Sequence, residues 1–259
     1  MRAIWTGALS FGLVNIPVRL YSATEEHALD LDMLHKDDLS PIRYARVCRA
    51  DGKEIPYDDI VKGYEYHKGD YIILADEDFK RANARKTKTI DIVDFSKADE
   101  IDSVFYEKPY FLEPDKGAGK PYALLREAIK KSKKVGVARF VLRNREHLAV
   151  VKPFGNVLVL NQMRFFSELR KPEGLDLPAK STAAKGKELD MALALIDQLT
   201  GPFKPEEYKD TYTAELKAVI AEKAKGKKPR KKGKEPQPTE VTDLMAMLRK
   251  SLEKEKQRA

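Results

Sequence analysis

The sequence has very little cysteine: Cys48 is the only one among 259 residues. A single thiol cannot form an internal disulfide, and it lacks the second thiolate that a zinc knuckle would need. Chains without disulfides are typical of reducing compartments, so we expect a cytoplasmic protein. We also expect no metal site and no other cofactor.

A long uninterrupted hydrophobic run is also missing. The most apolar stretch, residues 3–21, contains the only tryptophan, but Gly12, Asn15 and Pro17 interrupt it. A secretion signal needs a continuous apolar segment, and a membrane helix needs about 20 nearly unbroken apolar residues. Alternating apolar residues in the second half of the stretch favour extended chain. We therefore predict one or two core strands here, joined or bent near Gly7 to Gly12, and no membrane contact.

Catalytic constellations are absent as well. The four histidines are scattered, and none adjoins a nucleophile motif. The loop 117–120 resembles a phosphate loop, but its glycine spacing is wrong and Pro121 stands where Ser or Thr is required. Acidic pairs such as Asp58-Asp59 lie in separate regions, whereas a metal-dependent nuclease needs clustered carboxylates. We therefore predict that the protein is not an enzyme.

The chain does contain many short alternating segments, most of them in its first two thirds. Besides the opening stretch, the predicted strands are 41–47, 71–74, 89–95, 104–106, 110–113, 135–142, 147–151 and 157–163. The predicted helices are 76–86, 120–134, 187–200, 205–222 and 239–254. Short strands followed by helices are typical of a β-barrel with helical appendages. We expect a mainly β fold with α appendages.

The composition changes near Lys171, where the prolines and glycine of residues 172–178 mark a connection. We expect a β core over residues 1–185 and a helical C-terminal arm over 186–222. The last segment, 223–259, is expected to be a Lys-rich disordered tail that ends in a short helix.

The net charge of +8 is concentrated in this tail. Residues 223–234 contain eight Lys and Arg and no acid, and without them the basic and acidic residues are equal in number. Such a run of cations indicates contact with a polyanion. Any nucleic-acid binding by the folded part must come from basic surfaces that the fold assembles, because its bulk charge is neutral.

Further groups of cations lie in the neutral part of the chain. Lys and Arg side chains can neutralise phosphates without reading bases, so these groups are candidate nucleic-acid contacts. The candidates before the tail are Lys80, Arg81, Arg85, Lys86, Lys88, Lys130, Lys131, Lys133, Lys134, Arg143 and Arg145. In the tail they are Lys225, Lys227, Lys228, Arg230, Lys231 and Lys232.

Several blocks of sequence carry a resemblance to a known family. The most distinctive is the opening run from Ile4 to Tyr21, IWTGALSFGLVNIPVRLY. The others, in chain order, are 39–44, 51–54, 60–66, 107–114, 122–128, 138–143 and 145–148. Together these blocks resemble bacterial Ku, the DNA-end-binding protein of non-homologous end joining. Some relatives carry paired cysteines where this chain has only Cys48.

The resemblance implies a Ku-like β-barrel with an extended bridge arm, in a homodimer whose ring is threaded by a duplex end. It implies sequence-independent binding of double-stranded DNA ends, no catalysis, a location on the nucleoid, and recruitment of an ATP-dependent DNA ligase, ligase D. We expect the arm over about residues 75–121, which doubled back could reach at most roughly 75 Å. The ligase is expected to dock on Tyr208, Tyr212 and Leu216.

Two other functions stay open at this point. One is a general nucleic-acid-binding barrel without preference for ends. The other is a metal-dependent nuclease or other DNA-processing enzyme. Linear and covalently closed DNA distinguish the first alternative from end binding, and incubation of linear DNA with Mg²⁺ tests the second.

Overall fold

The computed structural model describes residues 1–83, 88–178, 186–226 and 244–256. The chain forms two units, Met1–Lys171 and Pro172–Ala259. The division falls at the change of composition near Lys171, earlier than the expected end of the core at residue 185. No helix among the described residues is both long and apolar enough to cross a membrane.

Seven strands of the first unit close into a barrel in the order β1-β2-β6-β9-β8-β7-β5. Neighbouring strands are antiparallel except β1 and β5, whose parallel pairing closes the barrel. The strands are β1 Trp5–Phe11, β2 Val14–Ser22, β5 Thr89–Lys97, β6 Tyr106–Pro114, β7 Lys134–Leu142, β8 Arg145–Phe154 and β9 Val157–Met163. The predicted barrel with helical appendages is confirmed.

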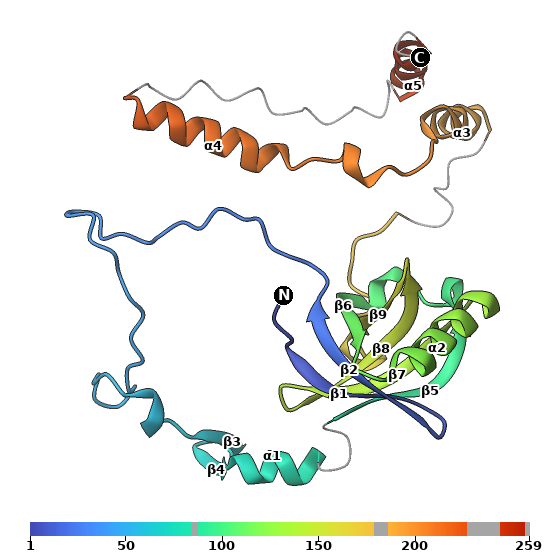
Figure 1. Ribbon diagram of the computed structural model, residues 1–259. Helices are drawn as coiled ribbons and strands as arrows, with labels where there is room; N and C mark the ends of the chain where they lie inside the picture. The colour runs from blue at the N-terminus through green and yellow to red at the C-terminus, as the bar shows by residue number, and fades with distance from the viewer. Residues whose placement is uncertain (84–87, 179–185, 227–243, 257–259) are drawn as a thin grey trace. The chain divides into compact units, whose positions relative to one another are not determined.

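The opening stretch forms the hairpin of β1 and β2 (Figure 1). Gly12 adopts φ +58° in the turn, a conformation that glycine reaches without the steric cost of a Cβ. The alternating residues Leu9, Ile16, Val18 and Leu20 point into the barrel and are fully buried. The sequence therefore supplies two adjacent core strands, as predicted.

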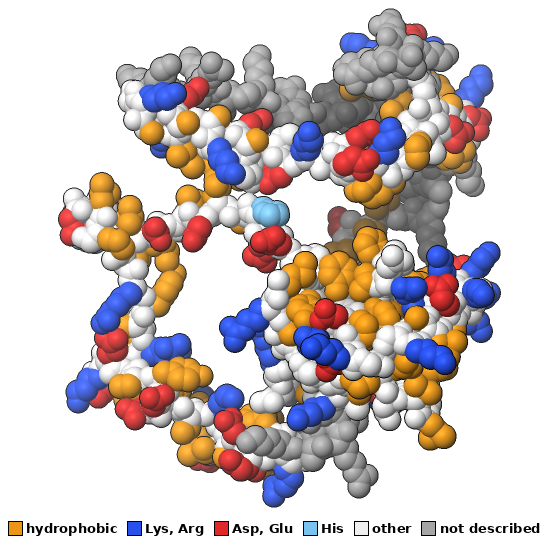
Figure 2. All heavy atoms as spheres, in the orientation of Figure 1, with side chains coloured by type: hydrophobic (Ala, Val, Ile, Leu, Met, Phe, Trp, Pro, Cys, Tyr) orange, Lys and Arg blue, Asp and Glu red, His pale blue; other side chains and the backbone are white. Residues whose placement is uncertain are grey.

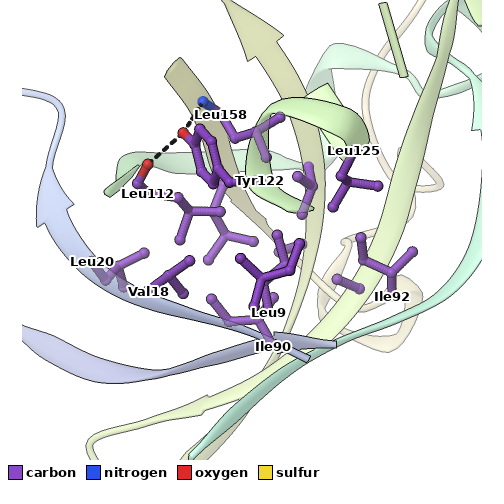
Figure 3. Close-up of a cluster of buried hydrophobic side chains, with 14 of the residues drawn as sticks. Leu9, Val18, Leu20, Ile90, Ile92, Leu112, Tyr122, Leu125 and Leu158 are labelled. Atoms are coloured by element: carbon purple, nitrogen blue, oxygen red, sulfur yellow. Dashed lines mark hydrogen bonds between the residues drawn. The ribbon is translucent and has the colours of Figure 1, made fainter. Parts of the chain in front are cut away.

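The helix α2, Gly119–Ser132, covers one end of the barrel. Its Tyr122, Leu125 and Ile129 are buried in the same apolar cluster as the inward residues of the strands. Figure 3 shows Tyr122 and Leu125 in this cluster. The Tyr122 hydroxyl donates to the carbonyl of Leu112 on β6 and accepts from the amide of Leu158 on β9, both at 2.6 Å. This end is where β6 stops and β9 starts.

Residues 23–88 form a long insertion between β2 and β5, which we call the arm. It contains the two-stranded sheet of β3 Lys62–His67 and β4 Asp70–Leu74, followed by the helix α1 Asp76–Asn83 (Figure 1). The expected bounds of the bridge, about 75–121, are wrong, because β5, β6 and the start of α2 within that range belong to the barrel. The excursion begins directly after the opening hairpin instead.

Two local strand predictions in the first unit also need correction. Residues 41–47 form no strand: Pro41 and Val47 each make only an isolated bridge. Residues 103–105 form a short 3₁₀ helix, and β6 starts after it at Tyr106. Residues 41–47 alternate, and residues 104–106 are the continuous run Val-Phe-Tyr. Neither 41–47 nor 103–105 has a neighbouring strand among the described residues against which its full length could pair.

The second unit contains the helices α3 Lys187–Leu199, α4 Thr211–Ala224 and α5 Leu244–Lys256. Helices α3 and α5 pack against each other. The predicted helix 205–222 is divided: Pro205–Glu207 is a 3₁₀ turn, and α4 begins where the Asp210 side chain accepts from the amide of Thr213. Of the predicted helix 239–254, residues 239–243 lie outside the described residues.

Candidate nucleic-acid interface

The candidate cations of the barrel fall into two separate groups. Lys130, Lys131, Lys133 and Lys134 lie where α2 ends and β7 starts. Arg143 and Arg145 lie beyond the other end of β7, which has nine residues and spans about 30 Å at ~3.3 Å per residue. The fold therefore places these groups at opposite ends of the barrel, and they cannot act as one continuous patch.

The four lysines form a compact cluster, the α2 lysine cluster. All four are exposed, and Lys133 ends the helix in a left-handed conformation with φ +56°. Cations at the C-terminal end of a helix interact favourably with the helix dipole and with the last carbonyl groups. Among the described residues none of the four forms an ion pair with an acidic side chain. The cluster is therefore available to phosphates.

The cations of the arm are placed less completely. Lys80 belongs to α1, Arg81 is exposed and lies 3.7 Å from Asp78, and Lys88 is exposed in the turn before β5. Arg85 and Lys86 lie outside the described residues. The first turn of α1 is acidic. The proposed role of this group in DNA contact stays a prediction.

In the tail, Lys225 is exposed and caps the C-terminal end of α4. The other tail candidates lie outside the described residues: Lys227, Lys228, Arg230, Lys231 and Lys232. On the face seen in Figure 2, Lys and Arg side chains are interspersed with Asp and Glu rather than gathered into one area.

The end of the barrel away from α2 carries a polar cavity of about 520 Å³, which we call the barrel mouth. Arg143 and Arg145 line it, together with Lys108 of β6 and His147 of β8. Lys108 and His147 were not among the candidates predicted from the sequence. The two-residue period of each strand could have indicated that they face inward, since Lys108 shares the inward face of β6 with buried Tyr110.

A hydrogen-bonded chain of polar side chains forms the floor of the barrel mouth. The Tyr110 hydroxyl donates to Gln162 Oε1 at 3.3 Å, and Gln162 Nε2 donates to Glu107 at 3.0 Å. Gln162 is the one buried polar residue within the described part of the chain. Burial lowers the pKa of His147 below its ordinary value, which favours the neutral ring near pH 7.

The candidate ligase-docking residues do not share one helix face. Tyr212 and the half-buried Leu216 lie one turn apart on α4, whereas Tyr208 precedes the helix and stacks on Phe203 with ring centroids 5.5 Å apart. Tyr208 and Tyr212 are 74% and 72% exposed. These two aromatic rings are accessible to a partner. Nothing in the described part of the fold places Tyr208 on the same helix face as Tyr212 and Leu216.

No group of three or more His, Cys, Asp or Glu side chains within the described part of the chain is placed to hold a metal ion. The free Cys48 is half-buried. Its amide and carbonyl pair with Lys53 and Gly52 in a turn of the arm, so the residue has a structural position there.

These features define a seven-stranded β-barrel protein with an inserted arm and a helical extension. Residues 10–191 match the family described as the Ku70/Ku80 beta-barrel domain. The chain belongs to the Ku family. Curated relatives named non-homologous end joining protein Ku match along most of their own lengths. The relative from Opitutus terrae is 47% identical over 97% of this chain and 91% of its own, and that from Bacillus subtilis is 38% identical over 98% and 82%.

A third relative, from Saccharopolyspora erythraea, is named non-homologous end joining protein Ku 2. It is 41% identical over 98% of this chain and 84% of its own. The similarity thus extends beyond the barrel into the second unit. The resemblance seen in the opening run and the later sequence blocks is confirmed.

Proposed function

We propose that the protein binds double-stranded DNA ends without sequence preference in non-homologous end joining, and that it does so as a scaffold rather than an enzyme. The observation that carries this proposal is the family match over residues 10–191, which covers the barrel from the end of β1 onward and the whole arm. The relatives' shared name supplies the repair process.

The topology of the arm supports threading of DNA. The arm leaves β2 and returns to β5, the two strands that flank β1 in the barrel. Doubled back on itself at ~3.3 Å per residue, the segment 23–88 could extend on the order of 100 Å. It is long enough to arch over a duplex that lies against the barrel. An arm held at both ends to the same barrel can encircle a duplex without reading its bases.

A homodimer would complete the ring. The sheet of β3 and β4 is exposed on both faces, including Tyr64, Tyr66 and Ile73. An isolated pair of strands is marginal in water, and an apolar surface of this kind is typical of an interface. We propose that a second copy of the chain covers it.

Topology-dependent binding tests the proposal. The full chain is titrated with a linear duplex and with a covalently closed circle of the same sequence, at the same salt concentration. We expect at least tenfold tighter binding to the linear form, since a closed circle offers no end to thread. A linear duplex blocked at both ends by a bulky protein serves as control and should be bound like the circle. Equal affinity for all three would favour a general nucleic-acid-binding barrel.

The same linear duplex with Mg²⁺ tests the enzymatic alternative. A scaffold leaves the strands intact over hours, and the band pattern on a denaturing gel stays constant. Time-dependent cleavage that disappears with a chelator would establish a metal-dependent DNA-processing enzyme instead.

We further propose that the second unit recruits an ATP-dependent DNA ligase, ligase D, through the exposed rings of Tyr208 and Tyr212. The double variant Tyr208→Ala, Tyr212→Ala should reduce stimulation of end joining by the ligase and leave DNA binding unchanged. Phe203→Ala, which removes the ring against which Tyr208 stacks, should give a smaller loss of stimulation. Full stimulation by the double variant would move the docking site elsewhere.

A further inference from the structure

The two ends of the barrel differ in what fills them. Helix α2 fills one end with apolar side chains. At the other end the inward positions of several strands change from apolar to polar, and Ile4 and Leu142 complete the lining. Along β2 the inward series passes from Leu20 to Ser22, and along β9 from Leu160 to Gln162. The barrel mouth is therefore a polar recess, with no helix across it among the described residues.

The barrel mouth has more cations than its acids neutralise. Lys108, Arg143 and Arg145 line it, and Glu107 is the one carboxylate in its lining within the described residues. Glu107 already accepts from Gln162 and lies 3.8 Å from Arg164. The recess therefore has a net positive charge that its own side chains do not balance.

Two of the three cations lack an acidic partner in the described part of the chain. Arg145 pairs with Glu168, but neither Lys108 nor Arg143 forms an ion pair with any described residue. Both side chains are exposed, so they stay hydrated when unpaired and are accessible to an anion that enters the recess. Arginine is suited to phosphate in particular, because its planar donors can bind two oxygens at once.

The backbone of the β7–β8 turn fixes where Arg143 stands. Arg143 and Asn144 adopt φ +51° and +63°, a two-residue turn that usually takes Asn-Gly. A long charged side chain is unfavourable in the left-handed region, and strained residues of this kind occur at binding sites. Here the turn directs Arg143 to the lining of the barrel mouth rather than along the outer surface of the strand.

We propose that the barrel mouth binds a phosphate group, held by Arg143 and Lys108 at its rim. A cavity of about 520 Å³ is in the range of ligand pockets and has room for a phosphate with an attached sugar. The phosphate could come from the terminus of a DNA strand or from a free phosphate compound. The first source rests on the proposed function, whereas the second does not.

Free pyrophosphate tests the site without DNA. Calorimetric titration of the full chain should show saturable binding, and Arg143→Gln or Lys108→Gln should weaken it at least tenfold. The matched control is Lys116→Gln, an exposed lysine in the loop before α2 at the opposite end of the barrel. The three variants should melt at the same temperature as the parent chain. Absence of saturable binding, or equal affinity in the parent and both rim variants, would overturn the proposal.

The imidazole of His147 gives a readout at the site itself. A bound anion stabilises the charged ring, so pyrophosphate should raise the pKa of His147 in an NMR titration. The charged groups that face the ring are Lys108, Glu107, Arg143, Arg145 and Glu168. An unchanged pKa of His147 at saturating pyrophosphate would show that the anion binds elsewhere and would overturn the proposal.

Duplexes with different termini identify the source of the phosphate. If it is a strand terminus, a 5′-phosphorylated duplex should bind more tightly than a 5′-hydroxyl duplex, and Arg143→Gln should abolish the difference. If it is a free compound, pyrophosphate binds and the two duplexes have equal affinity. Failure of all duplex binding would contradict the proposed function, whereas the pyrophosphate and His147 results would still decide the site.

Discussion

The hydroxyl of Tyr122 joins α2 to two strands of the barrel. Tyr122 is 5% exposed, and its hydroxyl donates to the carbonyl of Leu112 and accepts from the amide of Leu158. Those two residues face each other on β6 and β9. One side chain therefore completes the hydrogen bonding of the strand ends while its ring fills the core beneath the helix (Figure 3).

Tyr122→Phe should destabilise the barrel by about 1–3 kcal/mol, because it leaves a buried donor and a buried acceptor without partners. Urea denaturation followed by the fluorescence of Trp5 measures the change, since this single tryptophan packs against the barrel core. The matched control is Tyr71→Phe on β4, whose ring is 63% exposed and should cost less than about 0.5 kcal/mol. Equal urea midpoints for the two variants would show that the hydroxyl of Tyr122 does not stabilise the barrel.

Among the elements, those with strong local patterns were predictable. The hairpin of β1 and β2, the helix α2 and the strands β7 to β9 follow from alternation, turn residues and apolar spacing. The bounds of the arm were not predictable in this way. They depend on the parallel pairing of β1 with β5, and no local feature of the sequence specifies a contact between segments that far apart.

The candidate interface was predictable in its residue types but not in its arrangement. The sequence shows four lysines near residue 132 and two arginines near 144, but the strand between them carries the groups to opposite ends of the barrel. Lys108 was missed because its strand was predicted to start at Tyr110, so its inward register was not visible.

The α2 lysine cluster allows a test of phosphate binding at the scale of one element. Replacing Lys130, Lys131, Lys133 and Lys134 with Gln should weaken duplex binding and flatten the plot of log K against log salt. The slope falls by about 0.9 for each phosphate that the cluster no longer neutralises. The four Lys→Arg replacements keep the charge and should keep the slope. If the Gln variant has the parent slope, the cluster only stabilises the end of α2.

At the scale of the whole molecule, the neutral charge of most of the chain is compatible with DNA binding. Eight cations of residues 223–234 account for the net charge of +8. The remaining cations and acids are equal in number and are interspersed on the face seen in Figure 2, so on that face a duplex would meet local groups rather than one strongly charged area. A closed ring would increase the affinity of such binding, since weak contacts would then act on a duplex that can dissociate only by sliding off its end.

Such a ring requires a dimer of the chain. Native mass spectrometry should give twice the 29.4 kDa of the chain. Ile73→Asp on β4 places a charge where a side chain is 64% exposed, so it should leave the monomer folded but disfavour an apolar interface. We expect the variant to be monomeric and to lose its preference for linear over closed DNA. Lys68→Asp, in the exposed turn between β3 and β4, is the control and should stay dimeric. A dimeric Ile73→Asp variant that retains end preference would show that the arm sheet is not the interface.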